Sequence, residues 1–262
     1  MIFDSHAHYY SKAFNRDRDE LLRRMHEEQD VTAILCPAEN MVSSAACVAL
    51  AEGYDFIYAA VGIHPCWADS WREDTAPSLS ALLDHEKVVA LGETGLDYYR
   101  RDDNREAQKR VFAAQLELAK AKRLPAVIHD REAHGDMYDM LRHFRPEGVM
   151  HCFSGSVELA REALSLGLYI GLGGSVTAVN AVKPVEVAKY VPLDRLVLET
   201  DAPYLIPRPY RTGPDKYDRS ESWMIRYVAE FIAEIRGIDP DMLLEITARN
   251  AARLYGVEGG SN

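Results

Sequence analysis

Eight short apolar runs, rich in β-branched residues, recur along this chain at fairly even intervals. They are Ile2 to His8, Val31 to Cys36, Ile57 to His64, Val88 to Glu93, Ala126 to His129, Val149 to Phe153, Tyr169 to Gly173 and Leu196 to Asp201. Most are continuous hydrophobic strings, which is typical of strands buried on both faces. Segments with helical patterning separate them, most clearly Asp103 to Arg123. This alternation predicts an α/β fold with a parallel sheet and right-handed crossovers.

Five of the runs end in side chains that can bind a metal ion. These residues are His6, His8, Glu93, His129, His151 and Asp201. Because residues i and i+2 of an extended strand share a face, His6 and His8 can point at one ion, with Asp4 on the same face below them. Each residue alone has an ordinary explanation, such as a turn carboxylate or a hydrogen-bonded histidine. Their recurrence at five strand ends instead indicates a metal centre.

Two architectures are compatible with eight alternating units, an open doubly wound sheet and a closed barrel. The barrel fits better because His6 and His8, on the first strand, must meet Asp201, on the last, and these strands are neighbours only when the sheet closes. Barrel active sites also lie at the C-terminal ends of the strands. We therefore predict a single (β/α)8 TIM-type barrel over residues 1–262, with the metal site at that end.

Six strong ligands exceed the needs of one tetrahedral ion, so we expect two divalent metal ions, about 3.5–4 Å apart with a water or hydroxide between them. Geometry suggests His6, His8 and Asp201 for one ion and His129 and His151 for the other. Glu93, central in strand order, is the natural bridge between them. Asp201 is expected to orient the attacking water and to act as general base. The donor set suits Zn, Mn or Co and also admits Mg.

Composition limits the ways in which this protein can bind other molecules. The formal net charge of −11 argues against a broad basic surface that grips long duplex nucleic acid, but not against a phosphate-bearing substrate at a metal site. Four cysteines without C-x-x-C spacing are expected to be reduced thiols. Neither a signal peptide nor a membrane span is predicted. We expect a cytoplasmic protein that does not bind membranes.

The motifs at the strand ends resemble those of the TatD family of metal-dependent hydrolases, and the resemblance spans nearly the whole chain. The matching stretches are Phe3 to His8, Val61 to Pro65, Gly92 to Tyr99, Leu124 to His129, His151 to Gly155, Leu198 to Leu205 and Asn250 to Gly256. Many other amidohydrolase-like barrels bridge their metals with a carbamylated lysine. Here the fourth run contains no lysine and Glu93 takes that position, which favours TatD over those relatives.

The resemblance implies a metal-dependent deoxyribonuclease, generally a 3′→5′ exonuclease that trims single-stranded DNA ends. It implies the same six ligands and assigns His64, in Gly62-Ile63-His64-Pro65, to the scissile phosphate. An exonuclease that engages a few terminal nucleotides needs no extended basic surface, which agrees with the acidic composition. We expect a monomer.

Substrate contacts are expected near the mouth of the site. Candidate hydrogen-bond donors to a substrate phosphate are Arg131, Arg208 and Arg211, since a guanidinium matches phosphate geometry. Tyr204 is a candidate for base stacking. Solvated arginines and packed tyrosines are the alternative interpretations. The loop at 203–222 departs from the compact Arg-Asn-Glu-Pro stretch common in the family, so substrate preference is the property least securely inherited.

Two other interpretations remain open. The same site can hydrolyse an amide, lactone or ester of a small metabolite, or an aminoacyl ester on tRNA, because barrel chemistry varies with the loops. A metal-loaded scaffold that only binds a partner is the non-enzymatic alternative. Activity on a labelled oligonucleotide against a panel of cyclic amides separates the enzymatic hypotheses.

Overall fold

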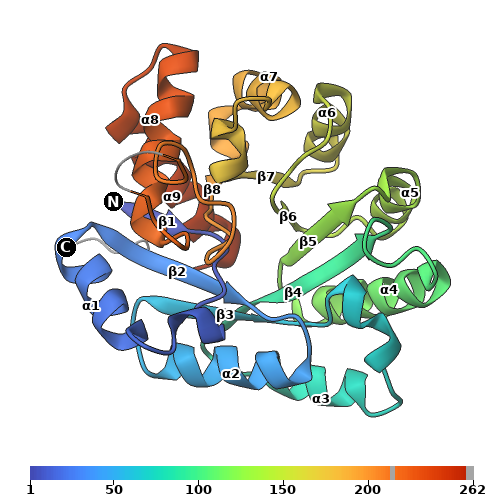
Figure 1. The fold of residues 1–262 in the computed structure, drawn as a ribbon. Coiled ribbons are helices and arrows are strands. Elements are labelled where there is room, and N and C mark those ends of the chain that lie inside the picture. Colours follow the sequence, from blue (N-terminus) through green and yellow to red (C-terminus); the bar gives the residue numbers. More distant parts are fainter. Residues whose placement is uncertain (213–215, 258–262) are drawn as a thin grey trace. The chain divides into compact units, whose positions relative to one another are not determined.

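The computed structural model describes residues 1–212 and 216–257, in which eight strands alternate with helices (Figure 1). The order of the strands in the sheet is that of the sequence, β1 to β8. This confirms the predicted (β/α)8 fold class. The chain forms two compact units. Unit 1 comprises Met1–Cys36, Cys152–Glu162 and Ile170–Asn262, and unit 2 comprises Pro37–His151 and Ala163–Tyr169.

Unit 1 brings the two ends of the sheet together. Strand β1 (Ile2–Asp4) runs parallel to β2 (Val31–Pro37), and β7 (Tyr169–Leu172) runs parallel to β8 (Leu196–Leu198). Past the ends of β1 and β8, Ser5 N donates to Leu198 O and Asp201 N donates to His6 O, with a parallel bridge between Ala7 and Ala202. The first and last strands are therefore neighbours, as a metal site shared by their ends requires.

Helices cover the strands of unit 1. They are α1 (Arg18–Glu28), α6 (Val157–Ser165), α7 (Val182–Tyr190), α8 (Ile225–Arg236) and α9 (Pro240–Tyr255), with short helices η1 (Lys12–Phe14), η3 (Gly174–Thr177), η4 (Leu193–Arg195) and η5 (Ser222–Met224). Helix α9 packs against β1 and β8, and α8 packs against α9 (Figure 1). Helix α9 has Pro240 in its first turn and the side chain of Asp239 accepting from Met242 N, and it ends at Gly256. These capping residues set the limits of the helix.

Unit 2 holds the middle of the sheet. Its parallel strands are β3 (Ile57–Val61), β4 (Val88–Asp97), β5 (Ala126–Arg131) and β6 (Gly148–Met150). Its helices are α2 (Met41–Glu52), α3 (Thr75–Leu82), α4 (Arg105–Lys122), α5 (His134–Phe144) and η2 (Pro65–Ser70). Helix α2 packs against β3, and α4 packs against β4 (Figure 1).

The structure shifts several predicted strand ends. Strand pairing stops before His8, His64 and Asp201, which lie in the loops just past β1, β3 and β8. By contrast, β4 continues four residues beyond the predicted end at Glu93 and reaches Asp97. Loops after strands are where barrels hold their reactive groups, so the corrections move these residues toward the site-bearing end.

Candidate metal centre

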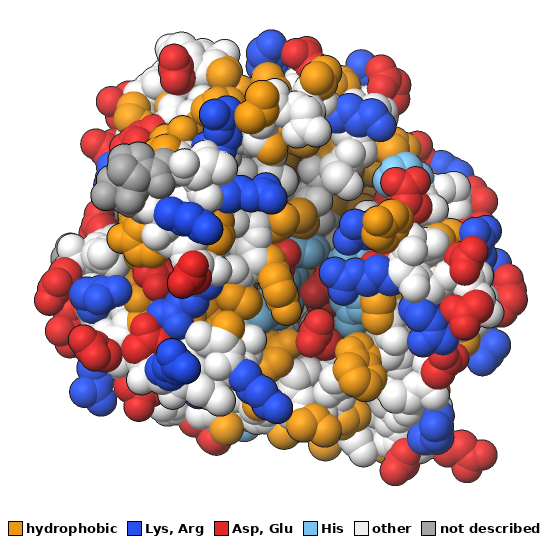
Figure 2. All heavy atoms as spheres, viewed as in Figure 1, with side chains coloured by type: hydrophobic (Ala, Val, Ile, Leu, Met, Phe, Trp, Pro, Cys, Tyr) orange, Lys and Arg blue, Asp and Glu red, His pale blue; other side chains and the backbone are white. Residues whose placement is uncertain are grey.

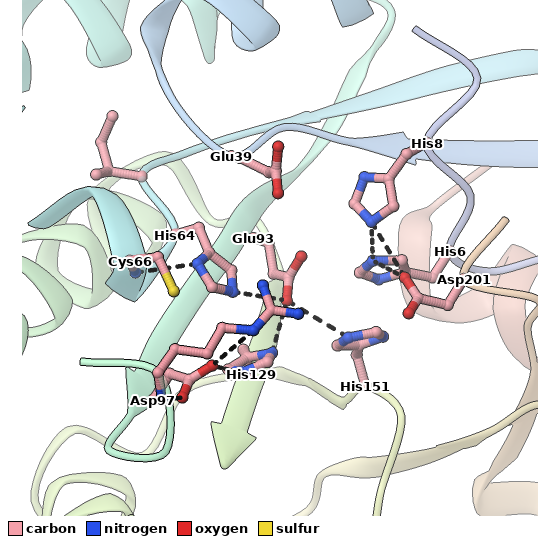
Figure 3. A network of polar contacts seen from close by, with 12 residues as sticks. His6, His8, Glu39, His64, Cys66, Glu93, Asp97, His129, His151 and Asp201 are labelled. Atoms are coloured by element: carbon pink, nitrogen blue, oxygen red, sulfur yellow. Dashed lines mark hydrogen bonds and ion pairs between the residues drawn. The ribbon is translucent and has the colours of Figure 1, made fainter. Parts of the chain in front are cut away.

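The first histidine group, His6, His8 and Asp201, lies in unit 1. His6 Nε2 lies 3.2 Å from His8 Nε2, and Asp201 Oδ1 lies 3.6 Å from His6 Nε2 and 3.1 Å from His8 Nε2 (Figure 3). Both histidines are buried. Three atoms that can ligate a cation thus converge, and two imidazoles with one carboxylate form a donor set that suits Zn, Mn or Co. These are the three residues that the sequence assigned to one ion.

Asp4 supports this group from below without joining it. Its Oδ1 accepts from His6 N (3.2 Å) and Thr200 N (3.0 Å), and its Oδ2 accepts from the hydroxyls of Thr200 and Ser222 (2.6 Å each). Burial raises the pKa of Asp4 to about 7 against the effect of these hydrogen bonds. The carboxylate joins the backbone of His6 to that of Thr200, the residue before Asp201. It therefore fixes the spacing between the chain segment that carries His6 and the one that carries Asp201.

The second histidine group, His64, Glu93, His129 and His151, lies in unit 2 and is centred on a single oxygen. Glu93 Oε1 lies 2.8 Å from His129 Nδ1, 3.4 Å from His151 Nε2 and 3.5 Å from His64 Nε2 (Figure 3). The predicted ligands Glu93, His129 and His151 are therefore brought together. His64, predicted as a substrate contact, stands against the same carboxylate.

Backbone and amide contacts hold Glu93 and His64 in place. Glu93 N donates to Ala38 O (2.7 Å) and His64 N donates to Glu39 O (2.8 Å), so the turn after β2 anchors both. The side-chain amide of the buried Gln115, on α4, accepts from Ile63 N and donates to Ile63 O and to the Thr94 hydroxyl. From the sequence, Gln115 is predicted only to lie in a helix, because a single buried amide produces no recurring pattern of residues along the chain.

Asp97 is a site residue that sequence reasoning missed. Its Oδ2 lies 3.1 Å from His129 Nε2, so this imidazole is held between two carboxylates. Burial acts to lower the pKa of His129, but its hydrogen bonds with Asp97 and Glu93 raise it to about 9. Strand β4 reaches Asp97 past Gly95, where φ is +141° and a Cβ would lie 2.0 Å from His129 O. Only glycine permits that approach.

His64 presents its Nε2 proton to the site. Its Nδ1 accepts from Cys66 N (3.0 Å), which leaves Nε2 as the protonated nitrogen of the neutral ring. Burial lowers the pKa of His64 to about 3. The structure therefore favours the neutral imidazole, with Nε2–H as the donor.

The predicted substrate residues fall in both units. In unit 1, the Tyr204 ring lies near His8, with ring centroids 6.3 Å apart, and Arg208 and Arg211 line a cleft beside η3. In unit 2, the Arg131 guanidinium stacks on the exposed ring of Tyr99, 4.1 Å from its centroid. Residues 213–215 of the divergent loop lie outside the described residues.

Charges of both signs are mixed on the molecular surface. Lys and Arg side chains are interspersed with Asp and Glu on the face shown in Figure 2, and they do not form a single broad basic patch there. Any nucleic acid that uses this face is therefore held by a few local contacts rather than by a long electrostatic track.

Known proteins match this chain over nearly its whole length. A family model described as TatD related DNase matches residues 3–256. The uncharacterized metal-dependent hydrolase YabD of Bacillus subtilis (strain 168) is 40% identical over 260 residues, covering 98% of this chain and 100% of YabD. The 3′-5′ ssDNA/RNA exonuclease TatD of Cronobacter sakazakii is 36% identical over 263 residues, covering 97% of each chain. The crystal structure of YJJV, a TatD homologue from Escherichia coli K12, superposes with a TM-score of 0.89 at 31% identity, covering 98% of each chain. The chain therefore belongs to the TatD-related DNase family, as the motifs at its strand ends had suggested.

Proposed function

We propose that this protein is a divalent-metal-dependent phosphodiesterase that removes nucleotides from the 3′ ends of single-stranded nucleic acid. The observation that carries the proposal is the pair of largely buried histidine groups, each built around a carboxylate oxygen. Family membership supports hydrolysis, and relatives about 35% identical that are named 3′-5′ ssDNA/RNA exonuclease support the polarity and the strand type.

In the first group, the donor atoms of His6, His8 and Asp201 converge and would hold one ion. In the second group, Glu93 and His129 converge with His64. We assign Glu93, His129 and His151 to a second ion because Glu93 Oε1 lies 2.8 Å and 3.4 Å from a ring nitrogen of each of these two histidines. When bound, divalent ions at such residues lower the pKa of water toward neutrality and screen charge on a phosphoryl group. Mg, Mn and Zn remain the candidates. The bridging role of Glu93 stays a prediction.

The remaining chemistry is assigned to side chains of the chain itself. Asp201, half-buried at the rim of the first group, orients the attacking water and accepts its proton. His64 donates a hydrogen bond from Nε2–H to a non-bridging phosphate oxygen, and its low pKa keeps the ring neutral. Asp97 fixes the tautomer and the orientation of His129 through Nε2.

Three properties remain predictions from the sequence: the cytoplasmic location, the monomeric state and the single domain over 1–262. In the described parts of the chain, no helix combines the length and the apolar character that crossing a bilayer requires.

The test is a time course on a 5′-labelled single-stranded oligonucleotide with metal-stripped protein to which Mg, Mn or Zn is returned. We expect a ladder that shortens from the 3′ end, that a block of 3′-terminal phosphorothioates stops, and that a 5′-terminal block does not. Glu93→Gln and Asp201→Asn are expected to abolish the ladder. Glu158→Gln, which removes an exposed carboxylate on α6, is the matched control and retains activity.

An intact oligonucleotide under every metal, with bound metal verified, overturns the nuclease proposal. Turnover of a panel of cyclic amides, lactones or aminoacyl esters under the same conditions assigns the site to the small-molecule or aminoacyl-ester alternative.

A further inference from the structure

A cleft of about 360 Å³ opens in unit 1 beside the first histidine group. One wall is η3 and the segment that follows it, and the other is the chain from Leu205 to Thr212. Its volume lies within the range of ligand-binding pockets. None of the candidate metal ligands lines it.

The charge of this cleft is opposite to that of the protein. Of the described residues that line it, only Arg208 and Arg211 are charged, and the other polar groups are hydroxyl and amide side chains such as Ser175 and Asn180. Both arginines are exposed. Among the described residues, neither guanidinium forms an ion pair or a hydrogen bond. In a chain of net charge −11, two cations that no described acidic residue pairs with in one cleft favour an anionic ligand.

The walls are tied to each other. The Thr177 hydroxyl accepts from Arg208 N (3.0 Å) and donates to Gly174 O (2.7 Å), which joins the two walls through one buried side chain. At Gly174 an added Cβ would lie 1.9 Å from Leu205 O, so the close approach of the walls depends on glycine. The arginines are thus carried on a fixed wall, which lowers the entropic cost of binding.

Tyr204 connects this cleft to the first histidine group. It directly precedes Leu205, a cleft residue. Its ring lies edge-on to that of His8, and its backbone N–H donates to Asp201 O. Tyr204 is exposed, at 58% of its residue surface. An exposed aromatic ring between a hydrolytic centre and a cationic cleft suits a nucleobase placed between two phosphates.

We infer that the cleft between η3 and residues 205–212 is a subsite for a phosphodiester of the strand beyond the bond that is cleaved. Arg208 and Arg211 bind its non-bridging oxygens, and Tyr204 stacks on the intervening base. The inference rests on the proposed function, because it takes the strand to be the substrate. It makes residues 205–212, within the divergent loop, a determinant of substrate length.

The first test measures KM and kcat on 5′-labelled oligonucleotides of two to twelve nucleotides. In the wild type, KM is expected to fall as the strand becomes long enough to reach the cleft. In Arg208→Ala/Arg211→Ala, KM for long strands is expected to rise about tenfold, as the removal of charge-assisted hydrogen bonds predicts. Turnover of the dinucleotide is expected to stay within about twofold of wild type. The control is Arg23→Ala/Arg253→Ala, which removes two exposed arginines from α1 and α9 of the same unit.

The second test needs no catalysis. Binding of labelled single-stranded DNA and RNA of one sequence to metal-free protein is followed by fluorescence anisotropy over a salt series. The slope of log K against log salt is expected to decrease by about 0.7 for each phosphate that the double variant no longer binds, equally for DNA and RNA. The subsite is overturned if the double variant keeps the wild-type salt slopes and the wild-type dependence of KM on strand length. It is also overturned if the double variant binds only DNA, or only RNA, more weakly than wild type does. If the wild type cleaves no strand but the variant still binds strands more weakly, the proposed function fails, and the cleft remains a strand-binding site that serves no cleaved bond.

Discussion

The two histidine groups use similar donors but are supported in different ways. In unit 1, the buried Asp4 accepts hydrogen bonds from the backbone of His6 and Thr200 and, within the described chain, forms none with the imidazole rings. In unit 2, the buried Asp97 contacts an imidazole directly, at His129 Nε2. One carboxylate therefore sets where the chain runs, and the other sets how a ring is oriented and protonated. Removing the first should act mainly on folding, and removing the second mainly on metal binding and activity.

The largest effect is expected at the carboxylate on which the second group converges. Since Glu93 Oε1 faces three imidazoles, Glu93→Gln should lower kcat/KM by more than the 10–100-fold typical of orienting residues, hence by more than about 10²-fold. Bound metal, measured by elemental analysis after gel filtration, should fall by about one equivalent per chain. A variant that keeps its full metal content would contradict the assignment of an ion to this group.

Asp4→Ala should act on stability. It leaves the N–H groups of His6 and Thr200 and the hydroxyls of Thr200 and Ser222 without their buried acceptor, and each unsatisfied donor costs about 1–3 kcal/mol. We expect the free energy of unfolding to fall by at least about 3 kcal/mol, measured by urea denaturation. Asp4→Asn, which keeps one acceptor oxygen, serves as the milder comparison. If Asp4→Ala and wild type are equally stable, Asp4 does not support the fold, and the difference proposed between Asp4 and Asp97 is wrong.

Asp97→Asn should leave folding intact and weaken metal binding. The introduced amide fills the volume of the Asp97 carboxylate, but the negative charge that contacts His129 Nε2 is lost. Removal of such a partner costs about 10–100-fold in metal affinity or activity. Competition with a fluorescent chelator gives the affinity, and Asp103→Asn, an exposed carboxylate near the start of α4, is the control. A drop in stability as large as that of Asp4→Ala would mean that both carboxylates are structural.

These supports mark the limit of what the sequence revealed. His6, His8 and Asp201 were found because strand periodicity and chain order suffice to bring them together. Asp97 was missed because the apolar run appeared to end at Glu93, whereas β4 continues through Gly95 against β5. Glu39 acts through one backbone contact, with His64 N, and Gln115 through hydrogen bonds with Ile63 and Thr94. Tertiary packing makes these contacts, and they leave no pattern along the chain.

The stability of the metal-free protein should decline with pH because of His129. Its folded pKa, raised to about 9, exceeds the ordinary value of 6.5, so its stabilising contribution is complete below pH 6.5 and is lost as pH rises to about 9. Asp4, with a pKa raised to about 7 from 3.8, also lowers stability as pH rises, but over the range from about 4 to 7. Thermal unfolding between pH 7.5 and 8.5 therefore lies above the range of Asp4 and largely below that of Cys66, whose thiol pKa burial raises from 9.0, so it reports mainly on His129. The decline should be smaller in Asp97→Asn, and a flat profile in wild type would refute the double-carboxylate pairing.

The smallest effect is expected at Cys66, although its thiol lies with His64 and Asp97 in an arrangement that can ligate a metal. What His64 Nδ1 accepts is the backbone N–H of Cys66, which any residue but proline supplies. Burial raises the pKa of the thiol, and metal ligation requires the thiolate. Cys66→Ala should therefore change kcat/KM by less than about twofold with full metal content, in contrast to Asp97→Asn, its neighbour in the same cluster. A drop of one equivalent of metal would instead place an ion on the His64 side of Glu93 and move His64 from substrate donor to ligand.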